Sequence, residues 1–252
     1  MCIRFSFQEK IIFFPQILPH NYQFQFEGDF EEIRIEAPDK VNLHGLLFKS
    51  EGRKGLIFYL HGNAGCVDSW GMVARDYTDL GYDLFMMDYR GYGKSGGFIS
   101  SEEQFLEDVR LAYDEFKSSY LEEEIVVLGY SLGTCSAAML AAERSPKMLI
   151  LQAPYYSLID IKRRTYPIIP DFLQKYKFET FKYIDKTLVP ITIFHGTEDG
   201  VVYYGSSIKL KEHLKPTDQL ITLKGEGHND MSSNREYQNA LRKVLGIVML
   251  ID

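Results

Sequence analysis

The sequence is poor in cysteine and tryptophan and has no long apolar run. Cys2, Cys66 and Cys135 are its three cysteines, and it has one tryptophan. An odd cysteine count without a C-x-x-C pair argues against a disulfide framework and a zinc site, and it fits a reducing compartment. No apolar stretch reaches the roughly 20 residues that a membrane-spanning helix needs. The start of the chain also lacks the charged, apolar and small-residue regions of a secretory signal.

Basic residues are in the minority. The chain has 28 Lys and Arg against 35 Asp and Glu, which gives a net charge of −7. No cluster of Lys and Arg indicates a nucleic-acid surface, and the basic step at Lys162-Arg163-Arg164 is short enough to be solvated surface. No G-x-G-x-x-G motif follows a predicted strand, and no His, Asp or Glu spacing resembles a metal site. We therefore expect no nucleic-acid partner, no nucleotide cofactor and no metal.

Aromatic and apolar residues, by contrast, are abundant. The chain has 17 Tyr and 17 Phe, and 45% of its residues are apolar, which is enough for a large core. A length of 252 residues suits a single domain spanning 1–252. Residues 1–28 are rich in aromatics and are predicted to be irregular, because Pro15 and Pro19 interrupt them. They could pack on the domain, lie at a membrane surface, or follow a membrane anchor; we expect a cytoplasmic protein, or a membrane-associated one if such an anchor is missing.

Short apolar runs alternate with helix-forming segments along most of the chain. The first two strands are predicted to pair antiparallel, and later apolar runs indicate strands buried on both faces. The predicted strands are 32–36, 41–49, 56–60, 82–87, 125–128, 148–151, 191–194 and 220–223. The predicted helices are 68–80, 101–118, 134–144, 204–214 and 234–246. This alternation predicts an α/β fold with about eight strands in a mostly parallel sheet, covered by helices on both faces.

Residues 155–189 interrupt the alternation. They contain many aromatic side chains, Pro167 and Pro170, and no buried strand. A connection of this length is usually functional. We expect a small lid over the carboxyl ends of the strands; the alternative is a surface excursion that only shields the sheet edge.

The pentapeptide Gly129-Tyr130-Ser131-Leu132-Gly133 stands between a predicted strand and a predicted helix. This is a G-x-S-x-G motif in the strand–turn–helix context of a nucleophile elbow, and its glycines allow a sharp turn. The N-terminus of the following helix directs backbone N–H groups to the place where negative charge would develop on a substrate. Ser131 is therefore the candidate nucleophile; the alternative is a serine in an ordinary strand–helix turn.

Two further polar residues follow later strands. Ligands of open α/β sheets bind at the carboxyl ends of the strands. Asp199 follows the strand at 191–194 and is the candidate acid, with the adjacent Glu198 as the alternative. His228 lies between glycines after the strand at 220–223 and is the candidate base. The order Ser131, Asp199, His228 is the order expected of a Ser…Asp…His triad on this architecture.

The loop His61-Gly62-Asn63-Ala64-Gly65 is predicted to approach a substrate closely because its residues are small. The backbone N–H groups of Asn63 and Leu132 are the candidate oxyanion-hole donors, with the Asn63 side chain as an additional one. We expect His61 to orient this loop and Asp88 to lie in a packed turn beside the site.

The remaining histidines and cysteines have simpler explanations. His20, His44 and His213 lack a comparable context and are predicted to be surface or structural residues. Cys135 is predicted to be a small buried side chain. Cys66 lies in the glycine-rich loop, where it either belongs to the core or lines a pocket.

Taken together, five segments resemble the motifs of α/β-hydrolase-fold serine hydrolases. They are H-G-N-A-G at 61–65, D-Y-R-G-Y-G-K-S at 88–95, G-Y-S-L-G at 129–133, H-G-T-E-D-G-V-V at 195–202 and G-E-G-H-N-D at 225–230. They most resemble a subgroup of membrane-anchored α/β-hydrolase-domain proteins that includes protein depalmitoylases. The resemblance implies Ser131 as nucleophile, His228 as base and Asp199 as acid. Gly200 departs from the subgroup, in which a bulkier or charged residue more often follows the acid.

We therefore predict a hydrolase that cleaves a carboxylic ester or thioester with an apolar acyl group, in a small-molecule or acylated substrate, through an acyl-enzyme. Peptidase, lysophospholipase and cofactor-free perhydrolase activities are the alternatives that share the triad. A hypothesis of another class is a binding protein that keeps the fold and uses the pocket as a receptor. A third is a membrane-surface protein in which the aromatic N-terminus matters more than catalysis.

Overall fold

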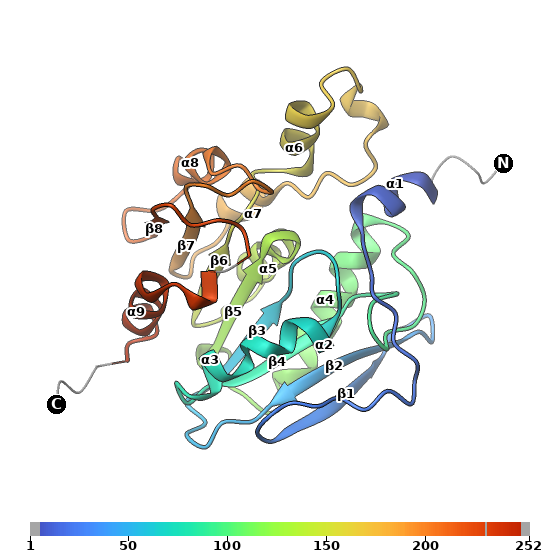
Figure 1. The fold of residues 1–252 in the computed structure, drawn as a ribbon, viewed down its shortest axis with the longest axis vertical. Helices are drawn as coiled ribbons and strands as arrows, with labels where there is room; N and C mark the ends of the chain where they lie inside the picture. The colour runs from blue at the N-terminus through green and yellow to red at the C-terminus, as the bar shows by residue number, and fades with distance from the viewer. Residues whose placement is uncertain (1–5, 230, 248–252) are drawn as a thin grey trace.

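Eight strands form one sheet in the computed structural model, which describes residues 6–229 and 231–247 (Figure 1). They are β1 Phe30–Glu36, β2 Asn42–Phe48, β3 Leu56–Leu60, β4 Asp83–Asp88, β5 Ile125–Tyr130, β6 Met148–Gln152, β7 Ile191–Gly196 and β8 Gln219–Leu223. Their order across the sheet is β1-β2-β4-β3-β5-β6-β7-β8. β2 pairs antiparallel with β1 and β4, and the other neighbours are parallel. The predicted fold class is confirmed. Cys2 and Asp230 lie outside the described residues.

Helices cover both faces of the sheet, which explains why its central strands are apolar at nearly every position. On one face lie α4 Glu102–Phe116 and α5 Thr134–Glu143, and on the other lie α2 Val67–Trp70, α3 Ala74–Thr78 and α9 Arg235–Val244 (Figure 1). Successive strand residues point to opposite faces. Val127 and Ile193 therefore belong to the core under α4 and α5, and Val126 and Phe194 belong to the core under α3 and α9.

Two predicted helices differ from the observed ones. The segment 68–80 is not one helix, because a 3₁₀ turn at Gly71–Val73 separates α2 from α3. Gly71 packs directly on Phe26: a Cβ at this glycine would lie 2.7 Å from the ring. The helix predicted at 204–214 is the shorter α8 Gly205–Lys211. In both cases the differences concern where the helix breaks or ends, which tertiary contacts decide.

The N-terminal segment is more ordered than predicted. Residues 1–28 were expected to be irregular, yet α1 covers Ser6–Ile12. Beyond it the chain runs across the sheet end in an extended form, with bridges from Pro15 to Gly65 and from Ile17 to Gly93. Phe13 is buried against Phe105, Tyr176 and Phe178. Of the roles considered for this segment, packing on the domain is the one that residues 6–18 display.

Residues 155–189, here called the cap, contain α6 Leu158–Thr165, a 3₁₀ turn at Asp171–Leu173 and α7 Thr180–Ile184. The cap and α1 lie side by side, since the Gln8 side chain donates to Leu173 O at 2.6 Å (Figure 1). Three of the aromatic residues that suggested a lid are buried: Tyr155, Tyr176 and Phe178. Phe172 instead points outward and is 84% exposed. Much of the aromatic signal thus comes from ordinary core packing beneath the cap.

Candidate active site

Ser131 stands at a sharp turn between β5 and α5. Its φ is +47°, a left-handed value that residues other than glycine seldom adopt. Glycine is required on both sides of this turn, because neighbouring backbone atoms leave no room for a Cβ. A Cβ on Gly129 would lie 2.6 Å from Gly133 O, and one on Gly133 would lie 2.1 Å from Leu60 O. The backbone geometry expected of a nucleophile elbow is therefore present, with local strain at the serine itself.

Asp199 lies in the turn after β7, and its side chain is 0% exposed. Its Oδ1 accepts the N–H groups of Val201 and Val202, each at 2.8 Å. Its Oδ2 lies 2.7 Å from His228 Nδ1 and 3.1 Å from His195 Nε2. Burial alone would raise the pKa of Asp199, but the hydrogen bonds from His195, His228 and the backbone hold this pKa well below its ordinary value. The carboxylate is therefore ionised at neutral pH.

His228 lies after β8, beside the turn that carries Ser131. Its ring meets the Tyr130 ring edge to face, with centroids 5.6 Å apart, and the Tyr130 hydroxyl donates to His228 O. Because Nδ1 faces the Asp199 carboxylate, that nitrogen carries a proton and Nε2 is the basic nitrogen of the neutral ring. The side chain is 10% exposed, so it reaches the surface from a mostly buried position.

The loops carrying Asp199 and His228 are bonded to each other as well as to the sheet. β7 and β8 are parallel neighbours, and Thr197 N–H and Glu198 N–H donate to Leu223 O and Glu226 O, each at 3.0 Å. A Cβ on Gly196 would lie 2.2 Å from Glu226 O, so the two loops touch at this glycine. The structure thus joins the predicted acid and base. The alternative acid, Glu198, is exposed and does not contact His228 in the described part of the chain.

Residues 51–183 match the family model described as serine aminopeptidase, S33. The chain belongs to this family of α/β-hydrolase-fold serine hydrolases. The α/β hydrolase domain-containing protein 17C of Xenopus tropicalis is 30% identical over 232 residues, which cover 88% of this chain and 72% of the relative. The human α/β hydrolase domain-containing protein 17B is 30% identical over 228 residues, which cover 86% of this chain and 76% of that protein.

Solved structures share the fold at low sequence identity. An esterase of Pyrococcus furiosus has a TM-score of 0.73 and 18% identity, covering 93% of this chain and 97% of that one. Est1E of Butyrivibrio proteoclasticus, solved with bound ferulic acid, has a TM-score of 0.70 and 23% identity, covering 84% and 97%. These structures share the fold of this chain, and the family identifies the protein as a serine hydrolase.

The candidate oxyanion loop of this serine hydrolase follows β3, which is the parallel neighbour of β5. The Asn63 side chain is used structurally: Nδ2 donates to Ile12 O at 2.5 Å, and Oδ1 accepts Phe14 N–H at 3.1 Å and the Tyr92 hydroxyl at 2.9 Å. The backbone N–H therefore stays the candidate donor, whereas the side chain is already committed. Trp70 supports the loop, since its indole N–H donates to Ala64 O at 2.9 Å.

The other polar residues near the serine hydrolase site have structural roles. His61 is buried, with Nδ1 bonded to Gly62 O at 2.7 Å, and it packs between Trp70 and Tyr89. Asp88 is the last residue of β4, is buried, and accepts Val67 N–H at 2.8 Å. His44 is also buried, 3.0 Å from Glu32. These placements agree with the sequence analysis.

Both described cysteines are buried core residues. Burial raises the pKa of the Cys135 thiol well above its ordinary value, and it raises the pKa of the Cys66 thiol to about 11. Cys66 therefore belongs to the core and does not line a pocket. Neither thiol is suited to act as a nucleophile in this serine hydrolase.

Two parts of the site were not predicted. His195, near the end of β7, contacts the same Asp199 carboxylate oxygen as His228. The H-G-x-x-D spacing could have indicated this contact, because it places a histidine at a strand end, four residues before the acid. Residues 12–16 hold the candidate oxyanion loop, and only their aromatic and proline content set them apart in the sequence.

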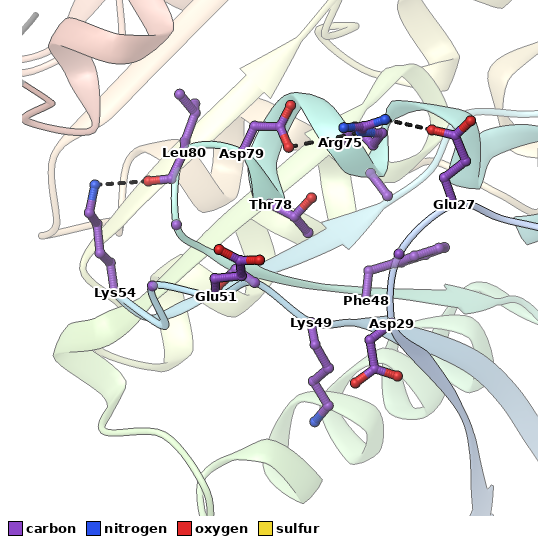
Figure 2. Close-up of a pocket in the computed structure, with 15 residues that line it drawn as sticks. Glu27, Asp29, Phe48, Lys49, Glu51, Lys54, Arg75, Thr78, Asp79 and Leu80 are labelled. Atoms are coloured by element: carbon purple, nitrogen blue, oxygen red, sulfur yellow. Dashed lines mark hydrogen bonds and ion pairs between the residues drawn. The ribbon is translucent and has the colours of Figure 1, made fainter.

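A groove of about 1030 Å³ lies elsewhere on the serine hydrolase, at the amino ends of β3 and β4 (Figure 2). The triad lies at the opposite, carboxyl ends of the strands. Figure 2 shows that two cations of the groove have partners: Arg75 pairs with Glu27 at 2.5 Å, and Lys54 donates to Leu80 O at 2.9 Å. This groove is therefore separate from the candidate active site.

Across residues 6–229 and 231–247, no helix combines the length and apolar character needed to cross a membrane. Within the same residues, no three His, Cys, Asp or Glu side chains are grouped so that they could bind a metal ion.

Proposed function

We propose that this serine hydrolase cleaves carboxylic esters or thioesters with an apolar acyl group through an acyl-enzyme. Ser131 Oγ attacks the carbonyl carbon while His228 Nε2 takes its proton, and Asp199 stabilises the imidazolium that forms. The N–H groups of Leu132 and Asn63 stabilise the oxyanion. His228 then gives its proton to the departing alcohol or thiol and activates the water that hydrolyses the acyl-enzyme.

The observation that carries this proposal is the 2.7 Å hydrogen bond between His228 and a buried Asp199, beside a serine at positive φ. A carboxylate and an imidazole that were both exposed to water would stabilise each other only weakly. Here the carboxylate is removed from water and the histidine is held by Tyr130, so the imidazole orientation is fixed before substrate binds.

An apolar acyl group is supported by the side chains around the site. Val201, two residues after Asp199, is 64% exposed. Phe14, whose N–H donates to Asn63, is 53% exposed. Both side chains point away from the core. They therefore provide apolar surface beside the proposed reacting groups.

Labelling with a fluorophosphonate probe followed by intact-mass measurement tests the nucleophile. We expect one adduct on the wild type and on Ser136→Ala, and none on Ser131→Ala. Ser136 is a matched control because it is another buried serine, on α5, whose hydroxyl bonds to Gly133 O. Ester turnover should fall by about 10⁴-fold or more in Ser131→Ala. Unchanged turnover in that variant would contradict the proposal.

Peptide hydrolysis is the second candidate, because the matching family is described as serine aminopeptidase. A panel of acyl esters, acyl thioesters and aminoacyl anilides separates the two activities. The proposal requires kcat/KM to be highest for esters or thioesters and to rise with acyl length. Higher values for the anilides would favour the peptidase.

A further inference from the structure

His195 is a buried histidine that the proposed mechanism does not use. It lies on β7, its side chain is 0% exposed, and both ring nitrogens have partners. Nδ1 is 2.6 Å from the Ser207 hydroxyl on α8. Nε2 is 2.9 Å from Val202 O and 3.1 Å from Asp199 Oδ2. A second histidine therefore reaches the same carboxylate oxygen as His228.

The partners of His195 determine where its proton lies. A carbonyl oxygen can only accept, and the ionised Asp199 carboxylate can also only accept. Nε2 faces both, so it must carry the proton and share it between them. The Ser207 hydroxyl can donate to the other nitrogen, Nδ1, and thereby fixes this tautomer.

With His195 included, the Asp199 carboxylate is saturated with donors. Oδ1 accepts the N–H groups of Val201 and Val202, and Oδ2 accepts from the imidazoles of His195 and His228. Four donors fix the plane of the carboxylate. The two imidazoles also compete for the lone pairs of a single oxygen, which weakens the stabilisation that Asp199 gives to a protonated His228.

We propose that His195 is a positioning residue of the candidate triad: with Ser207 it forms a second hydrogen-bonded arm on Asp199, which orients the carboxylate and competes with His228 for its Oδ2. This inference rests on the proposed function, because it takes His228 as the base. Through this arm, α8 is connected to the base on the loop after β8.

Few other ionisable groups face these two rings in the described residues. Tyr204 lies edge-on to His195 at 5.5 Å, and its hydroxyl is paired with Thr222 at 2.6 Å. Beside His228 stand Tyr130 from β5 and Glu226 from its own loop, whose carboxylate is bonded to Asn234 at 2.5 Å. Asp199 is the group that contacts both histidines.

The test measures the titration of His228 by NMR, and the pH profile of kcat/KM on a short-chain ester, in wild type, His195→Leu and His195→Gln. Leucine removes the donor to Asp199. The midpoint of the His228 titration and the midpoint of the acid limb of the kcat/KM profile should therefore rise by about half a pH unit or more. Turnover at neutral pH should fall about 10-fold or more, because the carboxylate loses a charge-assisted hydrogen bond. Glutamine keeps an N–H donor near the Nε2 position and should restore both values.

Ser207→Ala is a milder variant that decides the matter if His195→Leu does not fold. It should move the His228 titration in the same direction by a smaller amount. Ser206→Ala is its matched control, because Ser206 is the neighbouring buried serine of α8 and is not the one bonded to His195. A titration that does not move upward in folded His195→Leu, or in Ser207→Ala relative to Ser206→Ala, would overturn the inference. The NMR measurement needs no turnover, so it can fail or succeed independently of the proposed hydrolysis.

Discussion

The two sides of the active site are held in place by different kinds of interaction. On one side, the triad residues stand in turns directly after β5, β7 and β8, where neighbouring parallel strands fix their separation. On the other side, the candidate oxyanion loop and the cap are held largely by side-chain hydrogen bonds to residues 8–14 and by the packing of Phe13. A defect on the first side should therefore affect chemistry, whereas a defect on the second should affect stability and substrate binding.

The largest expected effect is on the first side, in Asp199→Asn. Both carboxylate oxygens accept two N–H groups, so either orientation of an asparagine amide would turn its NH₂ group toward donors. His228 would lose its correct tautomer, and kcat should fall by about 10⁴-fold. Steady-state kinetics on a short-chain ester measure this.

Glu198→Gln is the matched control for this prediction, because it changes the adjacent carboxylate, which is exposed. Its kcat should stay within about twofold of the wild type, as is usual for a surface change of small energetic effect. Comparable losses in the two variants would mean that the charge of the loop matters and not the Asp199 hydrogen bonds.

Gly133→Ala tests the turn itself. A Cβ at this position would lie 2.1 Å from Leu60 O, so β3 and the turn must separate. We expect a loss of about 1–3 kcal/mol in the free energy of unfolding, as for other overpacked sites, together with reduced fluorophosphonate labelling. Chemical denaturation gives the first value and intact mass the second.

Gly200→Ala is the corresponding control in the acid loop. No atom lies within 4 Å of where its Cβ would be, so the variant should be as stable as the wild type or slightly more stable. The same open space would admit a residue bulkier than glycine at this position. A destabilised Gly200→Ala would show that the loop needs the freedom of glycine.

The sequence predicted the triad side of the site better than the side formed by the candidate oxyanion loop and the cap. Ser131, Asp199 and His228 were identifiable because each follows an apolar run that fixes where its strand ends. The contact between Gln8 and Leu173 spans 165 residues, and the break at Gly71 depends on Phe26, so neither leaves a local pattern. Asn63 was predicted to lie in the oxyanion loop, but the use of its side chain depends on the distant residues Ile12 and Phe14.

A smaller effect is expected on the second side, in Asn63→Ala. This variant keeps the backbone N–H but removes the hydrogen bonds to Ile12 O, Phe14 N–H and the Tyr92 hydroxyl. We expect a loss of about 1–3 kcal/mol in stability from the groups left without partners. The Ser131 nucleophile should still be labelled, although more slowly. Labelling at the wild-type rate with unchanged stability would show that residues 12–14 do not hold the loop.

The smallest effect on stability is expected at the tip of the cap, where Phe172 is 84% exposed, whereas Phe178 beneath it is fully buried. Phe172→Ser should change the free energy of unfolding by less than about 0.5 kcal/mol, because its ring loses little contact. Phe178→Ser should cost several times more, since it removes a buried ring and leaves a cavity. If the cap tip contacts the acyl chain, Phe172→Ser should raise KM for long-chain esters and leave short-chain esters unchanged. An equal change in KM for both would place the tip outside the acyl site and limit the cap to covering the sheet edge.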